Sequence, residues 1–345
     1  MAEASATVLP VHELVREDAP SRIGVLDGWR GISILAVLAA HLLPLGPGEW
    51  RLNLSAGLFG MALFFLLSGF LIATFLLERP AVGAFLVRRL CRILPLAWLY
   101  LALALALTLD PASSWAAHLL FYANLPPRPL TPLTAHMWSV CIEMQFYVAV
   151  ALLVAIGGRR GLLALPVLCL AVTGLRIHDE VYASIVTWYR IDEILAGCTL
   201  ALLCHGRTGE RLRAVANRVP QWPFVLLLAL SCLMQAGWLN YFRPYLAAIL
   251  VGLTVLQPRT RLGSLLAWRP LAYVAGISYA LYVIHPMLAA SWLGSGDLLE
   301  KYAKRPLLFL ALFFLAHLST YHYERHWTAL GRQLGGGWRR TRVAG

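Results

Sequence analysis

The chain has 345 residues, of which 59% are hydrophobic and 13% carry a charge, and its formal net charge is +12. This composition lies outside the range of an ordinary soluble domain and predicts an all-α, polytopic integral membrane protein. The arginines are spread over many short segments and do not collect in one basic domain. This distribution argues against nucleic acid as a partner and is typical of cytoplasmic loops between membrane spans.

The spacing of the cysteines argues against a zinc-binding protein, and the first residues argue against a cleaved secretory signal. The six cysteines include no Cys-x-x-Cys pair and no zinc-like spacing with histidine, and most lie in apolar runs. We therefore expect no metal site. Residues 1–24 lack the features of a secretory signal, so we expect a cytoplasmic N-terminal segment and insertion by the first span.

Apolar segments set the expected topology. A bilayer core needs about 20 apolar residues as a helix, with roughly 17 to 25 usable. By this measure about ten segments qualify, and the short ones are expected to be tilted or irregular. They lie near 26–46, 57–77, 95–110, 138–157, 162–177, 184–204, 223–239, 244–257, 271–293 and 307–323.

Positive charges provide a test of this topology. With the N-terminus in the cytoplasm, about 20 arginines and lysines fall on the inner side and about six on the outer side. This bias predicts a protein of the inner (plasma) membrane with both termini in the cytoplasm. We expect one membrane domain over 25–323 and a basic cytoplasmic tail over 324–345.

The first expected span carries two ionisable residues in the stretch LDGWRGISILAVLAAH. Arg30 and His41 are separated by about three helical turns, a rise of roughly 16 Å and an angular offset of only about 20°. They therefore share one face, with Arg30 near the cytoplasmic surface and His41 in the outer half. An ionisable group in a membrane is functional or paired by default. A snorkelling role beside Asp27 is the alternative for Arg30.

The fourth expected span opens with HMWSVCIEMQFY and carries a carboxylate. Ser139, Glu143 and Tyr147 are spaced i, i+4, i+8, so they lie along one stripe of the helix. This span enters from the outside, which puts Glu143 at a depth comparable to that of His41. We predict that Glu143 hydrogen-bonds to His41 and fixes its tautomer. A carboxylate that merely joins two helices is the alternative.

Two later spans carry further ionisable residues. In YRIDEILAG, Arg190 and Glu193 at i, i+3 can form an ion pair that is either structural or part of a substrate site. In ISYALYVIHP, Tyr282 and His285 are at i, i+3, and Pro286 disturbs the helix just beyond the histidine. Opened backbone at that depth usually lines a cavity. We expect His285 to face the same cavity as the histidine of the first span.

The stretch FLVRRLCRILP precedes the third expected span on the cytoplasmic side. Arg88, Arg89 and Arg92 surround the start of this helix, and Arg89 and Arg92 can present two guanidinium groups to one anion. Guanidinium groups suit phosphate because they offer bidentate hydrogen bonds. Binding of anionic membrane lipids, or a topological role alone, is the alternative.

Six stretches stand in a fixed order along most of the chain: LDGWRGISILAVLAAH, GLFGMALFFLLSGFLIA, RRLCRILP, WSVCIEMQFY, RIDEILAG and ISYALYVIHP. Together they resemble the integral-membrane acyltransferase-3 family. Each motif is weak alone, but six in the family's order are a strong signal. The sequence departs from the pattern in a slightly unusual IEMQFY. It also departs in placing Pro286 directly after His285, where the family often has a residue between them.

The resemblance implies transfer of an acyl group, usually acetyl, from a coenzyme A thioester to a sugar hydroxyl. The sugar would belong to a surface polysaccharide, a lipid-linked glycan or a glycosylated small molecule. The implied partners are acetyl-CoA or another acyl-CoA as donor, the carbohydrate acceptor and membrane lipids, and a homodimer is left open.

The family's functional residues carry over by position. The residues that match are Arg30, His41, Arg89, Arg92, Glu143, Arg190 and Glu193. We expect His41 and Glu143 to be catalytic, and Arg30, Arg88, Arg89 and Arg92 to bind acyl-CoA. The expected substrate-binding or cavity residues are Ser139, Arg190, Glu193, Tyr282 and His285.

A proton-coupled transporter or flippase for a glycan or small molecule is the competing hypothesis. Ten spans with buried histidine and carboxylates also describe such carriers. The sequence shows no inverted repeat, and the arginines suited to phosphate gather at one edge, which favours the enzyme. A structural scaffold would leave the buried charges unexplained.

Overall fold

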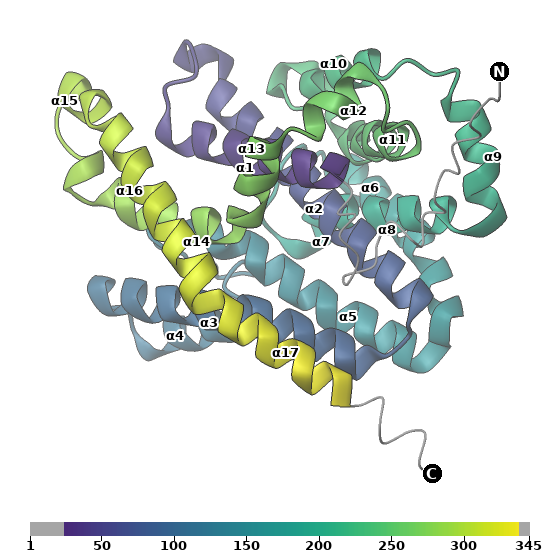
Figure 1. The fold of residues 1–345 in the computed structure, drawn as a ribbon. Coiled ribbons are helices and arrows are strands. Elements are labelled where there is room, and N and C mark those ends of the chain that lie inside the picture. Colours follow the sequence, from purple (N-terminus) through teal and green to yellow (C-terminus); the bar gives the residue numbers. More distant parts are fainter. Residues whose placement is uncertain (1–23, 338–345) are drawn as a thin grey trace, which may run out of the picture.

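The computed structural model describes residues 24–337, which form a helical bundle with no strand in that range (Figure 1). The first half contains α1 (Gly24–Leu42), α2 (Leu52–Glu78), α3 (Val82–Thr108), α4 (Ala112–Leu119), α5 (Trp138–Gly161), α6 (Leu165–His178), α7 (Thr187–Arg190) and α8 (Asp192–Cys204). The second half contains α9 (Gly206–Ala216), α10 (Trp222–Leu230), α11 (Arg243–Leu256), α12 (Arg261–Leu266), α13 (Arg269–Gly276), α14 (Ser278–Ala290), α15 (Leu298–Ala303), α16 (Arg305–Leu318) and α17 (Arg325–Gly337). Short 3₁₀ turns lie at Gly48–Trp50, Ala135–Met137, Leu162–Ala164, Met234–Phe242 and Trp292–Gly294.

The bundle is that of a multi-pass membrane protein, but the expected count of ten spans is not confirmed. In the described part of the chain, six helical segments are long and apolar enough to cross a membrane, and a seventh is added if α13 and α14, bent by 67°, form one span. Three expected spans contain helices of 14, 13 and 9 residues, namely α6, α8 and α10. These helices are shorter than the roughly 20 residues that a straight crossing requires.

Helix α2 is the centre of the bundle and packs tightly against α8. A Cβ atom at Gly69 would lie 1.9 Å from the carbonyl oxygen of Ile194, and one at Gly197 would lie 2.0 Å from that of Leu66. Only glycine leaves room for this reciprocal approach of two backbones. Small residues bring membrane helices together because packing, and not exclusion from water, drives their association.

Buried hydrogen bonds fix the rotation of α1 about its axis. The hydroxyl of Ser33 donates to the carbonyl of Gly60 on α2 at 2.7 Å. The indole nitrogen of Trp29 donates to the hydroxyl of Thr254 on α11 at 2.9 Å. Because both bonds lie on the buried face of α1, they determine which way its ionisable residues point.

The C-terminal helices form one long rod along the outside of the bundle (Figure 1). Helix α16 continues through a π-helical segment, Ser319–Glu324, into α17. Helix α17 crosses α3, where a Cβ atom at Gly331 would lie 2.8 Å from the Cβ of Cys91. The described part of the tail expected over 324–345 is therefore a packed helix, and its remaining residues, like 1–23, lie outside the described range.

Candidate active site

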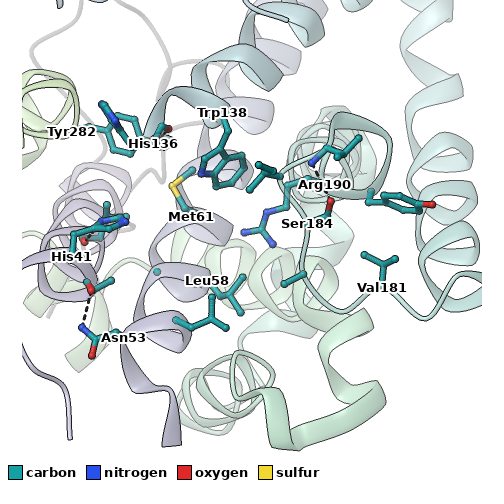
Figure 2. Close-up of a pocket in the computed structure, with 18 of the residues that line it drawn as sticks. His41, Asn53, Leu58, Met61, His136, Trp138, Val181, Ser184, Arg190 and Tyr282 are labelled. Atoms are coloured by element: carbon teal, nitrogen blue, oxygen red, sulfur yellow. Dashed lines mark hydrogen bonds between the residues drawn. The ribbon is translucent and has the colours of Figure 1, made fainter. Parts of the chain in front are cut away.

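A cavity of about 730 Å³ opens at the end of the bundle where α1 ends and α2 begins (Figure 2). We call it the histidine cavity. Its wall is built by the C-terminal end of α1, the start of α2, the segment before α5, α7 with the loop before it, and α14. The polar residues that line it are His41, Asn53, Arg128, His136, Ser184, Tyr189, Arg190 and Tyr282.

Three histidines lie close together, and two of them, His41 and His136, line the cavity. The ring centroids of His41 and His285 are 5.0 Å apart, and those of His136 and His285 are 5.4 Å apart. His285 is 1% exposed and His136 6% exposed, whereas His41 is accessible from the cavity. The structure therefore places the histidines of α1 and α14 side by side, but His285 is not among the residues that line the cavity, which it was expected to face. His136, from the turn before α5, was not expected at the site.

The hydrogen bonds of His41 and His285 define their tautomers. Nδ1 of His41 lies 2.9 Å from the carbonyl oxygen of Val37, and Nδ1 of His285 lies 2.7 Å from that of Tyr282. A carbonyl oxygen only accepts, so Nδ1 carries the proton in both rings. The Nε2 atom of His41 then keeps a free lone pair, which is what a general base or nucleophile requires.

Ser139 and Tyr282 form a polar contact behind the cavity. Their hydroxyl oxygens are 2.6 Å apart. The hydroxyl of Tyr282 also donates to the carbonyl of His136, so Ser139 is the donor in the first bond. Ser139 is 1% exposed and does not line the cavity itself, but it positions Tyr282, which does.

Glu143 lies one turn farther along α5 and has different partners from those expected. Its carboxylate accepts hydrogen bonds from the hydroxyl of Ser68 on α2 and from that of Tyr147 at 2.5 Å. Neither partner is His41, which bonds to Val37 of its own helix. The expected hydrogen bond between His41 and Glu143 is therefore not formed, because the carboxylate is engaged deeper in the bundle.

Arg30, Arg89 and Arg92 gather at the opposite end of α1, at what we call the arginine end. Arg30 interacts electrostatically with Arg92, with Arg89 and with the carboxylates of Asp27 and Glu143. Arg92 is exposed although it belongs to the membrane helix α3. An ionisable residue in a membrane helix is functional or paired by default, so Arg92 is a candidate binding residue.

Arg88 lies beside this group and faces a second, smaller cavity. Its guanidinium carbon is 5.9 Å from the ring centroid of Phe75. Together with Arg79 and Gly335 of α17, Arg88 lines a space of about 410 Å³ between α2, α3 and α17. The four arginines expected to bind the donor therefore occur at one end of the molecule.

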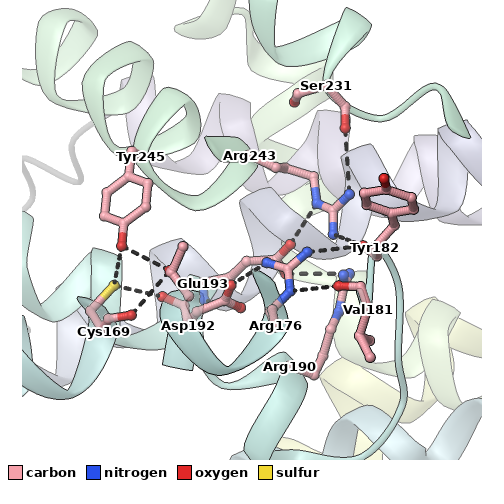
Figure 3. Close-up of polar contacts among 11 residues, drawn as sticks. Cys169, Arg176, Val181, Tyr182, Arg190, Asp192, Glu193, Ser231, Arg243 and Tyr245 are labelled. Carbon is pink, nitrogen blue, oxygen red and sulfur yellow. Dashed lines mark hydrogen bonds and ion pairs between the residues drawn. The ribbon is translucent and has the colours of Figure 1, made fainter. Parts of the chain in front are cut away.

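A network of buried ion pairs lies behind the histidine cavity (Figure 3). Arg176 pairs with Asp192, and Arg190 pairs with Glu193 at 3.3 Å, as its i, i+3 spacing predicts. Glu193 also accepts a hydrogen bond from Nε of Arg243 at 2.9 Å. Arg243 begins α11 and has no exposed surface. Its partner is distant in sequence, which is why its charge gave no signal of burial.

Arg190 alone of this network reaches the histidine cavity, opposite His41 (Figure 2). At the rim, the hydroxyl of Tyr189 donates to Asp179 at 2.6 Å, and this bond lowers the pKa of the Asp179 carboxyl. Asn53, another residue that was not expected, donates to the carbonyls of Ala40 and Leu43, both at 2.7 Å. It thereby caps the end of α1 next to His41.

Fold and site together define a multi-pass helical membrane protein with an accessible histidine in a polar cavity. Within residues 24–337, no group of three or more His, Cys, Asp or Glu side chains is placed to hold a metal ion. The arrangement offers proton-transfer or nucleophilic chemistry at imidazole, with arginines at the far end suited to an anionic group.

The chain belongs to the acyltransferase-3 family, since residues 23–322 match the family model described as "Acyltransferase domain". A Bacillus subtilis protein named "Putative peptidoglycan O-acetyltransferase YrhL" is 29% identical over 77% of this chain and 48% of its own length. O-acetyltransferase OatA of Staphylococcus aureus is 23% identical over 77% of this chain and 50% of its own length. The chain thus spans about half the length of the curated relatives that it matches. No solved structure gave a significant match.

Proposed function

We propose that the protein is a membrane-bound O-acyltransferase. It moves an acyl group, acetyl in the first instance, from acyl-coenzyme A to a hydroxyl of a sugar in a surface polysaccharide, a lipid-linked glycan or a glycosylated small molecule. The observation that carries the proposal is His41, whose Nε2 is free and faces a cavity of substrate size. The proposed location is the inner membrane, with the arginine end on the cytoplasmic side.

The arginine end is the proposed donor site. Arg89 and Arg92, with Arg30 and Arg88 close by, supply guanidinium groups for the phosphates of coenzyme A. Arg92 is exposed, so its guanidinium group is accessible to the phosphates of a donor.

A line of polar side chains on α5 supports a path between the two ends. Ser139 contacts Tyr282 of the histidine cavity, and Glu143, one turn on, interacts with Arg30 and Arg92. The proposed role of Glu143 is therefore to line the path of the long chain of coenzyme A that carries the thioester, and to balance the charge of the arginines. It does not orient His41. The orienting group is the carbonyl of Val37.

In the proposed reaction, Nε2 of His41 removes the proton from the acceptor hydroxyl as its oxygen attacks the thioester carbonyl. The carbon–sulfur bond then breaks, and the imidazolium returns the proton to the departing thiolate. In a second route, Nε2 attacks the thioester first and the carbon–sulfur bond breaks, which releases the thiolate. The acceptor oxygen then takes the acyl group from the acyl-histidine as the nitrogen–carbon bond breaks, and the proton of the acceptor hydroxyl ends on the thiolate. Both routes need the unprotonated Nε2.

The test is thiol release by purified protein in lipid nanodiscs supplied with acetyl-CoA and envelope glycans. We expect His41→Ala to lower acyl transfer by at least about 100-fold, in line with loss of a general base. His326→Ala, which removes an exposed histidine of α17, is the matched control. Full activity of His41→Ala would overturn the mechanism, and transport of the glycan without thiol release would favour a carrier.

A further inference from the structure

The histidine cavity is lined by positive charge alone. Arg128 and Arg190 belong to its wall, and no Asp or Glu is among the described residues that line it. A neutral sugar would bring no negative charge to either guanidinium group. The positive charge of the lining residues therefore indicates which charge the molecule that fills the cavity carries.

Arg190 lacks a full set of partners. It is 3% exposed, and its Nε has no hydrogen-bond partner. Its contact with Glu193, at 3.3 Å, is an ion pair without hydrogen-bond geometry, whereas Arg243 holds the same carboxylate by a hydrogen bond at 2.9 Å. Glu193 is thus already neutralised by Arg243.

The network behind the cavity has an excess of one positive charge. It contains three guanidinium groups, those of Arg176, Arg190 and Arg243, and two carboxylates, those of Asp192 and Glu193. A buried charge without a counter-ion is costly inside a membrane protein. Arg190 carries the unbalanced charge, because each of the other two arginines has a carboxylate as a hydrogen-bond partner.

Two further features hold the positive groups in place. The guanidinium carbon of Arg190 lies 5.6 Å from the ring centroid of Trp138, and this stacking orients it toward the cavity (Figure 2). Arg128 has a backbone φ of 58°, in the left-handed region that few residues other than glycine adopt. Strained backbone of this kind clusters at binding sites, where it aims a side chain.

We propose that the acceptor is anionic: a sugar that carries a carboxylate or a phosphate close to the hydroxyl that is acylated. The anionic group binds Arg190 and Arg128, and the sugar ring then lies across the cavity with its hydroxyl toward Nε2 of His41. The inference rests on the proposed function, whose acceptor class it narrows.

The test measures dissociation constants of purified protein in nanodiscs by calorimetry, with excess coenzyme A present to occupy the arginine end. The probes are two matched series that differ only at carbon 6: glucose, glucuronate and glucose 6-phosphate, and galactose, galacturonate and galactose 6-phosphate. We expect at least one charged member to bind ten times or more tighter than its neutral counterpart. A preference for uronates alone assigns a carboxylate, and one for phosphates alone assigns a phosphate.

Substitutions of the two arginines show whether these residues cause the preference for charged sugars. Arg190→Gln leaves two arginines and two carboxylates in the network, so its charge balances and the fold is retained. Arg128→Gln changes a loop residue outside that network. We expect each to reduce the preference below threefold, while Lys301→Gln, which removes a positive charge from α15, retains it.

Equal binding of charged and neutral sugars, no binding of any probe, or a preference that survives both Arg190→Gln and Arg128→Gln would overturn the inference. Cleavage of acetyl-CoA is measured in the same preparation. It distinguishes a wrong acceptor class from a wrong proposed function. If cleavage depends on His41 but no preference exists, the anionic acceptor alone is wrong. If the preference exists without cleavage, the anion site stands and the acyltransferase proposal fails.

Discussion

The two groups of arginines differ in how far they are exposed. In the network behind the histidine cavity, Arg176 and Arg243 are fully buried and each is held by a carboxylate. At the arginine end, Arg92 is exposed and interacts with Arg89 and with the carboxylates of Glu143 and Glu324. The difference indicates that buried arginines held by carboxylates hold the helices together, whereas the exposed Arg92 is accessible to an anion from outside the chain.

Glu193→Gln gives the largest expected effect, because it breaks the paired group. Arg243 and Arg190 would lose their shared carboxylate inside the bundle, which costs about 3–5 kcal/mol of folding free energy for a buried pair. We expect a large fall in the melting temperature in detergent. Asp179→Asn, which alters the carboxylate that accepts the hydrogen bond of Tyr189 at the rim, is the control. An unchanged melting temperature would mean that the network is not structural.

Arg92→Ala examines the arginine end, and it should act on the donor and not on folding. Loss of a charge-assisted bond to phosphate is worth about 1.5–3 kcal/mol, which raises KM for acetyl-CoA by roughly 10- to 100-fold. The melting temperature should stay near that of Arg160→Ala, an exposed arginine of α5. A selective rise in the KM of the acceptor would contradict a donor site at this end.

Ser68→Ala has the smallest expected effect and tests the link between the two ends. It removes one of the two hydrogen bonds to the Glu143 carboxylate, which costs about 1–3 kcal/mol if no water replaces it. We expect a modest loss of stability and a transfer rate lowered several-fold. Thr74→Val serves as the control, since that hydroxyl of α2 bonds within its own helix to the carbonyl of Phe70. Equal effects of the two variants would argue against a special role of Glu143.

Local spacing predicted several parts of the site. The pairing of Arg190 with Glu193 follows from one helical turn, and the structure forms it. His285 was expected to face the same cavity as His41. It lies beside His41, with ring centroids 5.0 Å apart, but it is not among the residues that line the cavity. Both predictions needed helix geometry together with the rule that ionisable groups avoid lipid.

Depth along a helix was harder to predict than its face. Hydropathy places the ends of a span with an error of a few residues, which amounts to about one turn of helix. That error is enough to bring Glu143 level with His41 in the expected arrangement, whereas in the structure it bonds to Ser68 and Tyr147. The count of ten spans is not confirmed for a related reason. The length of an apolar segment does not distinguish a straight helix from two short ones.

The sequence by itself determined the helical class, the membrane setting, the family and the residue types of the site, because these follow from composition, period and local order. Only the tertiary structure decided that His136 joins His41 and His285, that Arg243 neutralises Glu193, and that Arg190 is left with an unbalanced charge. These contacts join residues far apart in the chain. Their geometry depends on how close two helices approach and how each is rotated, which the packing of side chains such as Ser33 and Gly69 sets.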